Sequence, residues 1–265
     1  MDELARHNQQ RWEELAEANI LYSRPLLDLD ECSARAWLDP EGKMGEVAGK
    51  EVLCLAGGGG QQSVAFALLG AKVTVLDFSP KQLERDRQAA AHYGVGVKAV
   101  RGDMRDLSCF GKGSFDIVWH AHSLGFVPDA REVFGQVAGV LRVGGRYRLH
   151  CHNPFFHGLS KEDWNGKGYP LSRPYADGEV SYDDAHWDVD DGAGRVRRIK
   201  GPREFRHTLA TLVNRLIELG FVILGIWEET TGDRRAEPGS WEHFKAICPP
   251  GLTIWSHYQP GGVTA

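Results

Sequence analysis

The feature that most constrains the fold is a short apolar run that meets four consecutive glycines. Residues 52–56 read Val-Leu-Cys-Leu-Ala, residues 57–60 are glycine, and a helix-forming run continues through Leu69. This order predicts a strand, a tight loop and the start of a helix. Glycines let the backbone turn sharply and touch a ligand, and the N-terminus of the next helix favours an anionic group there. A plain connection needs only one glycine, so we interpret the stretch as a ligand-binding loop.

A second predicted strand supports this interpretation. Residues 71–76 are apolar and β-branched, and Asp77 follows them. An acidic residue at a strand end, about 20 residues past the glycines, binds the hydroxyls of a ribose. A dinucleotide fingerprint needs one further glycine, but Gln62 and Ser63 occupy the two possible positions. The ligand is therefore predicted to be a nucleoside, and an NAD-dependent oxidoreductase stays as the weaker alternative.

Four segments in this order resemble the motifs of class I S-adenosylmethionine-dependent methyltransferases that act on small molecules. Residues 52–60 resemble the first motif and residues 77–80 the acidic second one. Residues 102–104 and 115–118 resemble the third and fourth motifs, and the glycines at 144 and 145 resemble the turn before the fifth strand. The resemblance covers residues 45–150 and implies an enzyme that uses S-adenosyl-L-methionine as its cofactor.

The chain departs from the family pattern at two positions. Cys54 stands where an acidic residue usually lies near the methionine amino group, so another group must meet that ammonium. Ala56 stands where the first glycine is usual, which is tolerable if the φ angle there is negative. These departures keep a third interpretation open, a non-catalytic module that binds S-adenosylmethionine without turnover.

The resemblance also implies a set of cofactor contacts. Asp103 is expected to accept from the adenine amino group, Met104 to pack on the ring, and Gln82 to lie near the adenine edge. Trp12 and Tyr22 either face the cationic sulfonium or the acceptor, which an aromatic face favours, or pack on the surface. The expected cofactor-binding residues are Trp12, Tyr22, Ala56, Gly57, Gly58, Gly60, Gln61, Asp77, Phe78, Gln82, Asp103, Met104 and His120.

Histidines near the predicted strand ends are the candidate catalytic residues. Methyl transfer depends mainly on alignment, and it needs a general base only when the acceptor must lose a proton. Imidazole titrates near neutral pH, although each ring has a structural alternative as a hydrogen-bonded core residue. No Cys or Glu ligand stands near the His-x-His pairs, so no metal site is expected. The candidates are His120, His122, His150 and His152 at the strand ends and His207 at the start of the later helix, with His120, His122, His152 and His207 taken as the catalytic set.

The pattern of elements predicts an α/β fold, a doubly wound, mostly parallel, seven-stranded Rossmann-like sheet with an antiparallel last strand and a cap insertion. We expect one methyltransferase domain that comprises an N-terminal helical lid (1–45), a cofactor-binding core (46–152), an aromatic substrate cap (153–203) and a C-terminal helix and strand hairpin (204–265). Helices are predicted over 2–18, 80–93, 129–141 and 204–219, and the last two strands over 221–227 and 252–258. Asp188, Asp190 and Asp191 are interpreted as a solvated acidic turn rather than a cation site.

Net charge, cysteine usage and missing motifs limit the kinds of partner that the chain is expected to bind. The net charge of −5 argues against tight binding of nucleic acid, and the Asn/Asp-Pro-Pro-aromatic tetrapeptide of amino methyltransferases is missing after the fourth predicted strand. Five cysteines without a pairing pattern indicate reduced thiols. No signal peptide or membrane-spanning run is recognisable. We therefore expect a cytoplasmic enzyme with a small-molecule acceptor, whose accepting atom is oxygen, nitrogen, sulfur or carbon.

Overall fold

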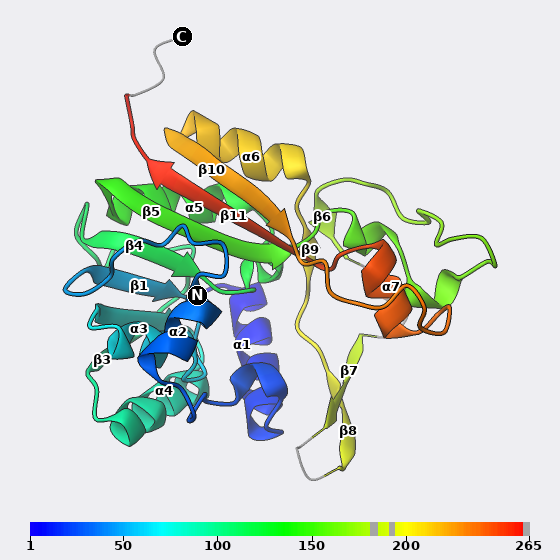
Figure 1. The fold of residues 1–265 in the computed structure, drawn as a ribbon, viewed down its shortest axis with the longest axis horizontal. Helices are drawn as coiled ribbons and strands as arrows, with labels where there is room; N and C mark the ends of the chain where they lie inside the picture. Colours follow the sequence, from blue (N-terminus) through cyan, green and yellow to red (C-terminus); the bar gives the residue numbers. More distant parts are fainter. Residues whose placement is uncertain (181–184, 191–193, 262–265) are drawn as a thin grey trace.

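A computed structural model describes residues 1–180, 185–190 and 194–261, and its centre is one seven-stranded sheet (Figure 1). Along the sheet the strand order is β10-β11-β5-β4-β1-β2-β3. Among the strand pairs described for this sheet, β11 pairs antiparallel with β5 and β10 and the other pairs are parallel, which confirms the predicted fold class. The strands are β1 (Glu51–Leu55), β2 (Lys72–Asp77), β3 (Val97–Arg101), β4 (Phe115–His120), β5 (Leu141–His152), β10 (Phe221–Glu228) and β11 (Gly251–Tyr258).

Helices cover both faces of the central strands of the sheet. Successive side chains of a strand point to opposite faces, so Leu53 and Leu55 of β1 join one apolar cluster while Val52 and Cys54 join another. All four side chains are fully buried, which explains why this strand reads as an unbroken apolar run. Helices α5 (Ala130–Val140) and α6 (Leu209–Glu218) contribute to the first cluster, and α2 (Glu31–Leu38), α3 (Gln62–Leu68) and α4 (Pro80–Tyr93) to the second.

Local sequence signals set the helix ends. Asp2 caps α1 (Glu3–Glu17) by accepting from the backbone N–H of Ala5, and Ser79 caps α4 by accepting from that of Gln82. The predicted helix over 204–219 begins later than expected, because Thr208 caps α6 by accepting from Thr211. The preceding residues form β9 (Phe205–Arg206), which pairs with β6 (Gly178–Glu179) in the cap.

The predicted cap lies beyond the carboxyl ends of the central strands (Figure 1). It contains the short 3-10 turns η3 (Phe156–Gly158) and η4 (Lys161–Asp163), and a hairpin of β7 (His186–Asp190) and β8 (Val196–Lys200) that projects from the body of the protein. The cap also receives α7 (Trp241–Ile247), which the sequence pattern missed in a stretch rich in turn residues, as it missed α2.

Asp191, one of the three residues interpreted as an acidic turn, lies outside the described residues. Within the described part of the chain, no helix combines the length and the apolar character needed to span a membrane.

Candidate functional site

The glycine loop donates its hydrogen bonds to carboxylates of the chain itself. The backbone N–H of Gly58 donates to Asp77 over 3.0 Å, and those of Gly59 and Gly60 each donate to Asp86 over 3.1 Å. The Ser63 hydroxyl also donates to Asp86, which is fully buried on α4. The expectation of an anionic ligand at these N–H groups is therefore wrong. A dinucleotide pyrophosphate would need the same donors, so the loop does not suit NAD.

The loop glycines differ in what they approach. A Cβ atom on Gly58 would lie 2.6 Å from that of Gln82 and 3.0 Å from the Asp77 carboxylate. A Cβ atom on Gly60 would lie 2.7 Å from the Arg85 carbonyl oxygen, so Gly60 allows the loop to pack on α4 and does not line the cavity described below. Gly60 was predicted to contact the cofactor, and the structure instead gives it a packing role. At Ala56, φ is +45°, so the negative φ that would make alanine tolerable is not adopted.

Asp77 lies at the end of β2 with its carboxylate against the cavity. One carboxylate oxygen accepts from Gly58 and the other accepts from the backbone N–H of Ser79 over 2.9 Å. Burial raises the pKa of Asp77 to about 6. Each oxygen can accept a further hydrogen bond, so the carboxylate is held in place and can still receive the hydroxyls of a ribose.

A cavity of 1220 Å³ is lined by residues of α1, of the carboxyl ends of the strands and of the cap. Typical ligand pockets measure about 300–1,000 Å³, so this space accommodates a cofactor together with a second small molecule. Of the residues predicted to bind the cofactor, Gly60 and His120 do not line the cavity. The predicted cofactor residues that do line it are Trp12, Tyr22, Ala56, Gly57, Gly58, Gln61, Asp77, Phe78, Gln82, Asp103 and Met104.

Two buried amide oxygens in the cavity wall have no hydrogen-bond partner. They are the side-chain oxygens of Gln62 and Gln82, although the amide nitrogen of Gln82 donates to the Ser23 hydroxyl over 2.9 Å. The Gln62 oxygen lies 3.4 Å from the position of a Cβ atom on Gly57. Unpaired buried acceptors favour a ligand that carries N–H donors. The ammonium and adenine amino groups of S-adenosylmethionine are such donors. Sequence reasoning missed Gln62 because it lies inside a helix-forming run.

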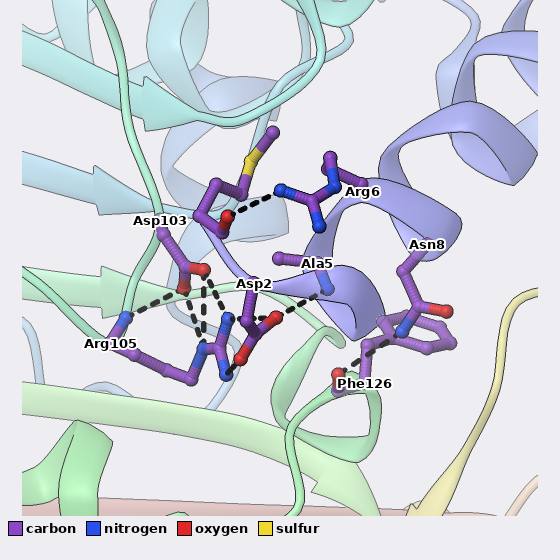
Figure 2. A network of polar contacts seen from close by, with 8 residues as sticks. Asp2, Ala5, Arg6, Asn8, Asp103, Arg105 and Phe126 are labelled. Atoms are coloured by element: carbon purple, nitrogen blue, oxygen red, sulfur yellow. Dashed lines mark hydrogen bonds and ion pairs between the residues drawn. The ribbon is translucent and has the colours of Figure 1, made fainter.

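Arg105 connects the N-terminal helix to Asp103 in the loop after β3 (Figure 2). The Arg105 guanidinium donates to Asp103 over 2.6 Å and to Asp2, the cap of α1, over 2.8 Å. The Asn8 amide of α1 donates to the Phe126 carbonyl oxygen over 3.2 Å. Asp103, expected to accept from the adenine amino group, is already paired with Arg105, whose role the sequence pattern did not reveal.

The segment that follows α1 is held in the same way. Arg85 of α4 donates to the carbonyl oxygens of Ala16 and Ser23. The amide of Gln61 donates to the Arg24 carbonyl oxygen over 2.9 Å. These bonds place Tyr22, which lies in η1 (Leu21–Ser23) and is 64% exposed, at the edge of the cavity.

Three histidines form one wall of the cavity at the carboxyl ends of β4 and β5. They are His122, His150 and His152, and the ring centroid of His122 lies 5.0 Å from that of His150 and 4.1 Å from that of His152. Desolvation lowers the pKa of His122 to about 4 and lowers the pKa values of His150 and His152 well below the usual range. All three rings are therefore neutral at pH 7.

The two other predicted catalytic histidines lie outside the cavity lining. His120 is fully buried, with one ring nitrogen 2.8 Å from the Tyr147 hydroxyl and the other 3.1 Å from the Ser123 hydroxyl. The ring of His207 lies 3.2 Å from the Leu124 carbonyl oxygen and faces a separate hollow of 280 Å³. Both side chains point away from the cavity and have polar partners, which fits the structural alternative for these residues.

Aromatic side chains from five separate elements line the part of the cavity beside the histidines. The Trp12 ring of α1 meets Phe126 edge-on at 5.2 Å and Trp187 of β7 at 5.8 Å. Phe156 of η3 and Trp241 of α7 also line the cavity. The structure therefore places aromatic residues of the predicted cap at the cavity and adds α7, with Trp241 and Lys245, to them.

Two acidic residues of the cap lie in a strand, whereas a turn was predicted for them. Asp188 and Asp190 are exposed to solvent as expected, but they belong to the strand β7 rather than to a turn, and they lie at the edge of the cavity. The expectation that no Glu lies near the histidines is also wrong. Glu204 offers a ligand atom within 4.8 Å of those of His152 and His157.

The chain is similar in sequence to known methyltransferases. A family model described as "Methyltransferase domain" matches residues 53–149. The chain is 35% identical over 191 residues to "Uncharacterized methyltransferase YbaJ" of Bacillus subtilis, covering 70% of this chain and 71% of that protein. It is also 35% identical over 108 residues to a ubiquinone biosynthesis O-methyltransferase of Xanthomonas euvesicatoria. That match spans only 41% of this chain and 45% of the relative.

Solved structures share the fold over most of the chain. An S-adenosylmethionine-dependent methyltransferase from Mesorhizobium loti is 26% identical, has a TM-score of 0.66 and is matched over 86% of this chain and 99% of that one. A geranyl diphosphate methyltransferase in complex with SAM is 19% identical, with a TM-score of 0.55, and covers 86% of this chain and 84% of that one. The second likeness concerns the fold alone.

Proposed function

The chain belongs to the class I S-adenosylmethionine-dependent methyltransferases, and we propose that its acceptor is a small, partly apolar molecule bound between the histidine wall and the aromatic cap. The observation that carries the proposal is the continuity of the cavity, which joins Asp77 and the glycine loop to His122 and His152. A methyl donor at the first end and an acceptor at the second would share one space closed by α1, so proximity would supply much of the rate.

At the cofactor end, S-adenosylmethionine supplies a methyl group on a sulfonium, and the chain supplies contacts that orient it. Asp77 is proposed to accept from the ribose hydroxyls, and Met104 and Asp103 to meet the adenine. The unpaired oxygen of Gln62 is proposed to accept from the methionine ammonium. This last contact would replace the acidic residue that Cys54 displaces, since the buried Cys54 thiol has a pKa raised well above its usual value by desolvation.

At the acceptor end, His122 is the proposed proton acceptor if the acceptor must lose a proton, and His152 lines the cavity beside it. The neutral ring of His122 can accept a proton at pH 7. Because the pKa of His122 is lowered to about 4, it is a weak base that takes protons only from comparatively acidic groups. The proposal therefore favours a thiol or a phenol over an aliphatic alcohol. The rings of Trp12, Trp187 and Trp241 would hold the apolar part of such an acceptor.

The remaining expectations fit the same proposal. We propose one methyltransferase domain in which residues 1–45 form the lid and residues 153–203, with α7, form the cap. The five cysteines are free thiols, and the chain carries a net charge of −5. These observations support a cytoplasmic enzyme without a nucleic-acid substrate.

The test is to follow a labelled methyl group. The protein is incubated with S-adenosylmethionine whose methyl group is isotopically labelled and with a metabolite extract that also contains protein and RNA. The small-molecule, protein and RNA fractions are then analysed by mass spectrometry for the label. We expect the label in a small molecule and not in the macromolecules, with none in the Asp77→Ala variant. Label in protein or RNA, or no product while cofactor binding is intact, would contradict the proposed acceptor class.

A further inference from the structure

Three side chains from separate segments converge beside the histidine wall. His152 ends β5, His157 lies in η3, and Glu204 directly precedes β9. One ligand atom of each lies within 4.8 Å of the other two. His157 and Glu204 are 3% and 5% exposed, so water competes little for them, while His152 lines the cavity. No contiguous motif encodes this group, because the fold brings its members together.

Two nitrogens of the group lack a hydrogen-bond partner. They are Nδ1 of His152 and Nε2 of His157, both buried. The neighbouring His120 and His207 differ, since their rings meet a hydroxyl or a carbonyl oxygen. Buried imidazole nitrogens in a protein core normally have a hydrogen-bond partner of this kind. An unpaired nitrogen pair beside a carboxylate therefore points to a bound ligand that accepts lone pairs from all three side chains.

We propose that His152, His157 and Glu204 bind a divalent transition-metal ion of the zinc type. A point exists within about 3 Å of all three ligand atoms, and modest side-chain rotation would shorten these distances to the ~2.0–2.1 Å of Zn–N and Zn–O bonds. Two imidazoles with one carboxylate suit zinc, cobalt or iron, whereas magnesium and calcium prefer oxygen ligands throughout.

The position of this metal site relates it to the acceptor. Three protein ligands leave one coordination position open in a tetrahedral site. The ring centroid of His152 lies 4.1 Å from that of His122, and both rings belong to the same wall of the cavity. Gly125 of η2 (Leu124–Phe126) leaves room beside the site, since a Cβ atom there would come within 3.3 Å of the His152 Nδ1 atom. An oxygen or sulfur atom of water or acceptor at the open position would lie close to the cavity.

Metal binding is tested on the full-length, untagged protein without cofactor or acceptor, so its outcome is independent of the proposed acceptor class. Co²⁺ serves as the probe because its visible absorption reports the ligand geometry. We expect one Co²⁺ per chain, displaced by Zn²⁺. His157→Gln and Glu204→Gln should each weaken Co²⁺ binding by roughly 10-fold or more. As a control, His243→Gln alters a buried histidine outside the group, bonded to Tyr169, and should leave the affinity unchanged.

Two results would overturn the metal site. One is the absence of stoichiometric Co²⁺ binding to the unaltered chain, and the other is binding that persists unchanged in both folded variants. If circular dichroism shows that the variants do not fold, crystals of the unaltered protein soaked in zinc chloride decide the question. An anomalous peak between His152, His157 and Glu204 supports the site, and a peak elsewhere or none refutes it.

Discussion

The backbone donors of the glycine loop and the histidines near the other end of the cavity differ in how they are paired. At the cofactor end, the N–H groups of Gly58, Gly59 and Gly60 all donate to carboxylates of the chain. At the acceptor end, His152 and His157 each keep a buried nitrogen without a partner. A closed network fixes the backbone in one geometry, which suits a ligand of constant shape. Buried acceptors without a partner occur near both ends, as the amide oxygens of Gln62 and Gln82 and as these two imidazole nitrogens, and we propose that bound ligands pair them.

The two regions also differ in how pH affects their titratable side chains. Burial raises the pKa of Asp77 to about 6 and that of Asp86 to about 7, which stabilises their protonated forms. Desolvation lowers the pKa of His122 to about 4 and that of His157 to about 3, which stabilises their neutral forms. Both ends of the cavity therefore disfavour the ionised form of their side chains, and they respond to pH in opposite directions.

Removal of residues 1–25 should have the largest effect, because α1 spans both ends. Arg105 and Arg85 bond it at the cofactor end, and Trp12 closes the acceptor end. We expect turnover to fall on the order of 100-fold, the loss that misplacement of reacting groups can cause. Methyl-transfer kinetics together with thermal melting measure the two effects.

The sheet should survive this truncation. Its two large apolar clusters contain no fully buried residue from positions 1–25, as far as the structure describes them. Leu15, Ala18 and Ile20 pack instead on Val189 of the hairpin. A folded truncation with normal turnover would contradict the lid, and a melting temperature that falls in step with activity would favour a purely structural helix.

Asp77→Ala should have the next largest effect and should separate the two ends. Charge-assisted hydrogen bonds contribute about 1.5–3 kcal/mol each, so S-adenosylmethionine affinity should fall at least ~10-fold by calorimetry. His122→Gln at the other end should leave that affinity unchanged. Asp106→Ala, which removes an exposed carboxylate outside the cavity, is the surface control. Equal losses in the Asp77 and His122 variants would mean that the two ends are not distinct.

The pH dependence of stability should differ between the ends by a few degrees of melting temperature. Asp86 has a folded-state pKa of about 7 against an ordinary value of 3.8, so its contribution is full below 3.8 and is lost as pH rises toward 7. His122 has a folded-state pKa of about 4 against 6.5, so its contribution is full above 6.5 and is lost as pH falls toward 4.

Two substitutions test these opposite slopes. Asp86→Asn should flatten the decline in stability between pH 3.8 and 7, although the loss of a carboxylate oxygen lowers stability overall. His122→Gln should flatten the decline between pH 6.5 and 4. Melting curves across this range give both slopes. The assignment fails if either variant keeps the slope of the unaltered protein.

Ala56→Gly should have the smallest effect and the opposite sign. A left-handed backbone costs a residue with a Cβ atom roughly 1–2 kcal/mol, and glycine relieves that strain. The greater freedom of glycine in the unfolded chain offsets part of the gain, so stability should rise by about 1 kcal/mol or less. Urea denaturation measures the change. Ala99→Gly, on β3, is the matched control and should destabilise, and a loss in both variants would show that Ala56 is not strained.

Much of the cofactor end could be predicted from the sequence, because local patterns encode it. The glycine run, Asp77 and Met104 each follow a strand end, and parallel strands bring their carboxyl ends to one edge. Asp86 and Gln62 were missed because they lie inside ordinary helical patterns, where nothing distinguishes a buried polar residue from a solvated one. His120 was assigned by its position at a strand end and His207 by its position at the start of a helix, and neither position reveals the direction of a side chain.

The acceptor end could be predicted only in outline. The aromatic composition of residues 153–203 indicated a cap, but α7 has seven residues and follows a stretch rich in turns. Glu204 lies 47 to 52 positions beyond His157 and His152 in the sequence, so only the tertiary fold could bring the three together. Groups assembled from distant segments leave no spacing pattern for sequence reasoning to detect.

The most direct test of the contrast between the two ends is a crystal structure with S-adenosylhomocysteine bound. We expect the ribose hydroxyls on the Asp77 carboxylate, the ammonium on the Gln62 oxygen, and the sulfur atom directed toward His122 and the aromatic cap. The histidine wall should remain free for a second molecule. A nucleoside seated against His122 and His152, with Asp77 and Gln62 making no contact to it, would contradict the assignment of the two ends.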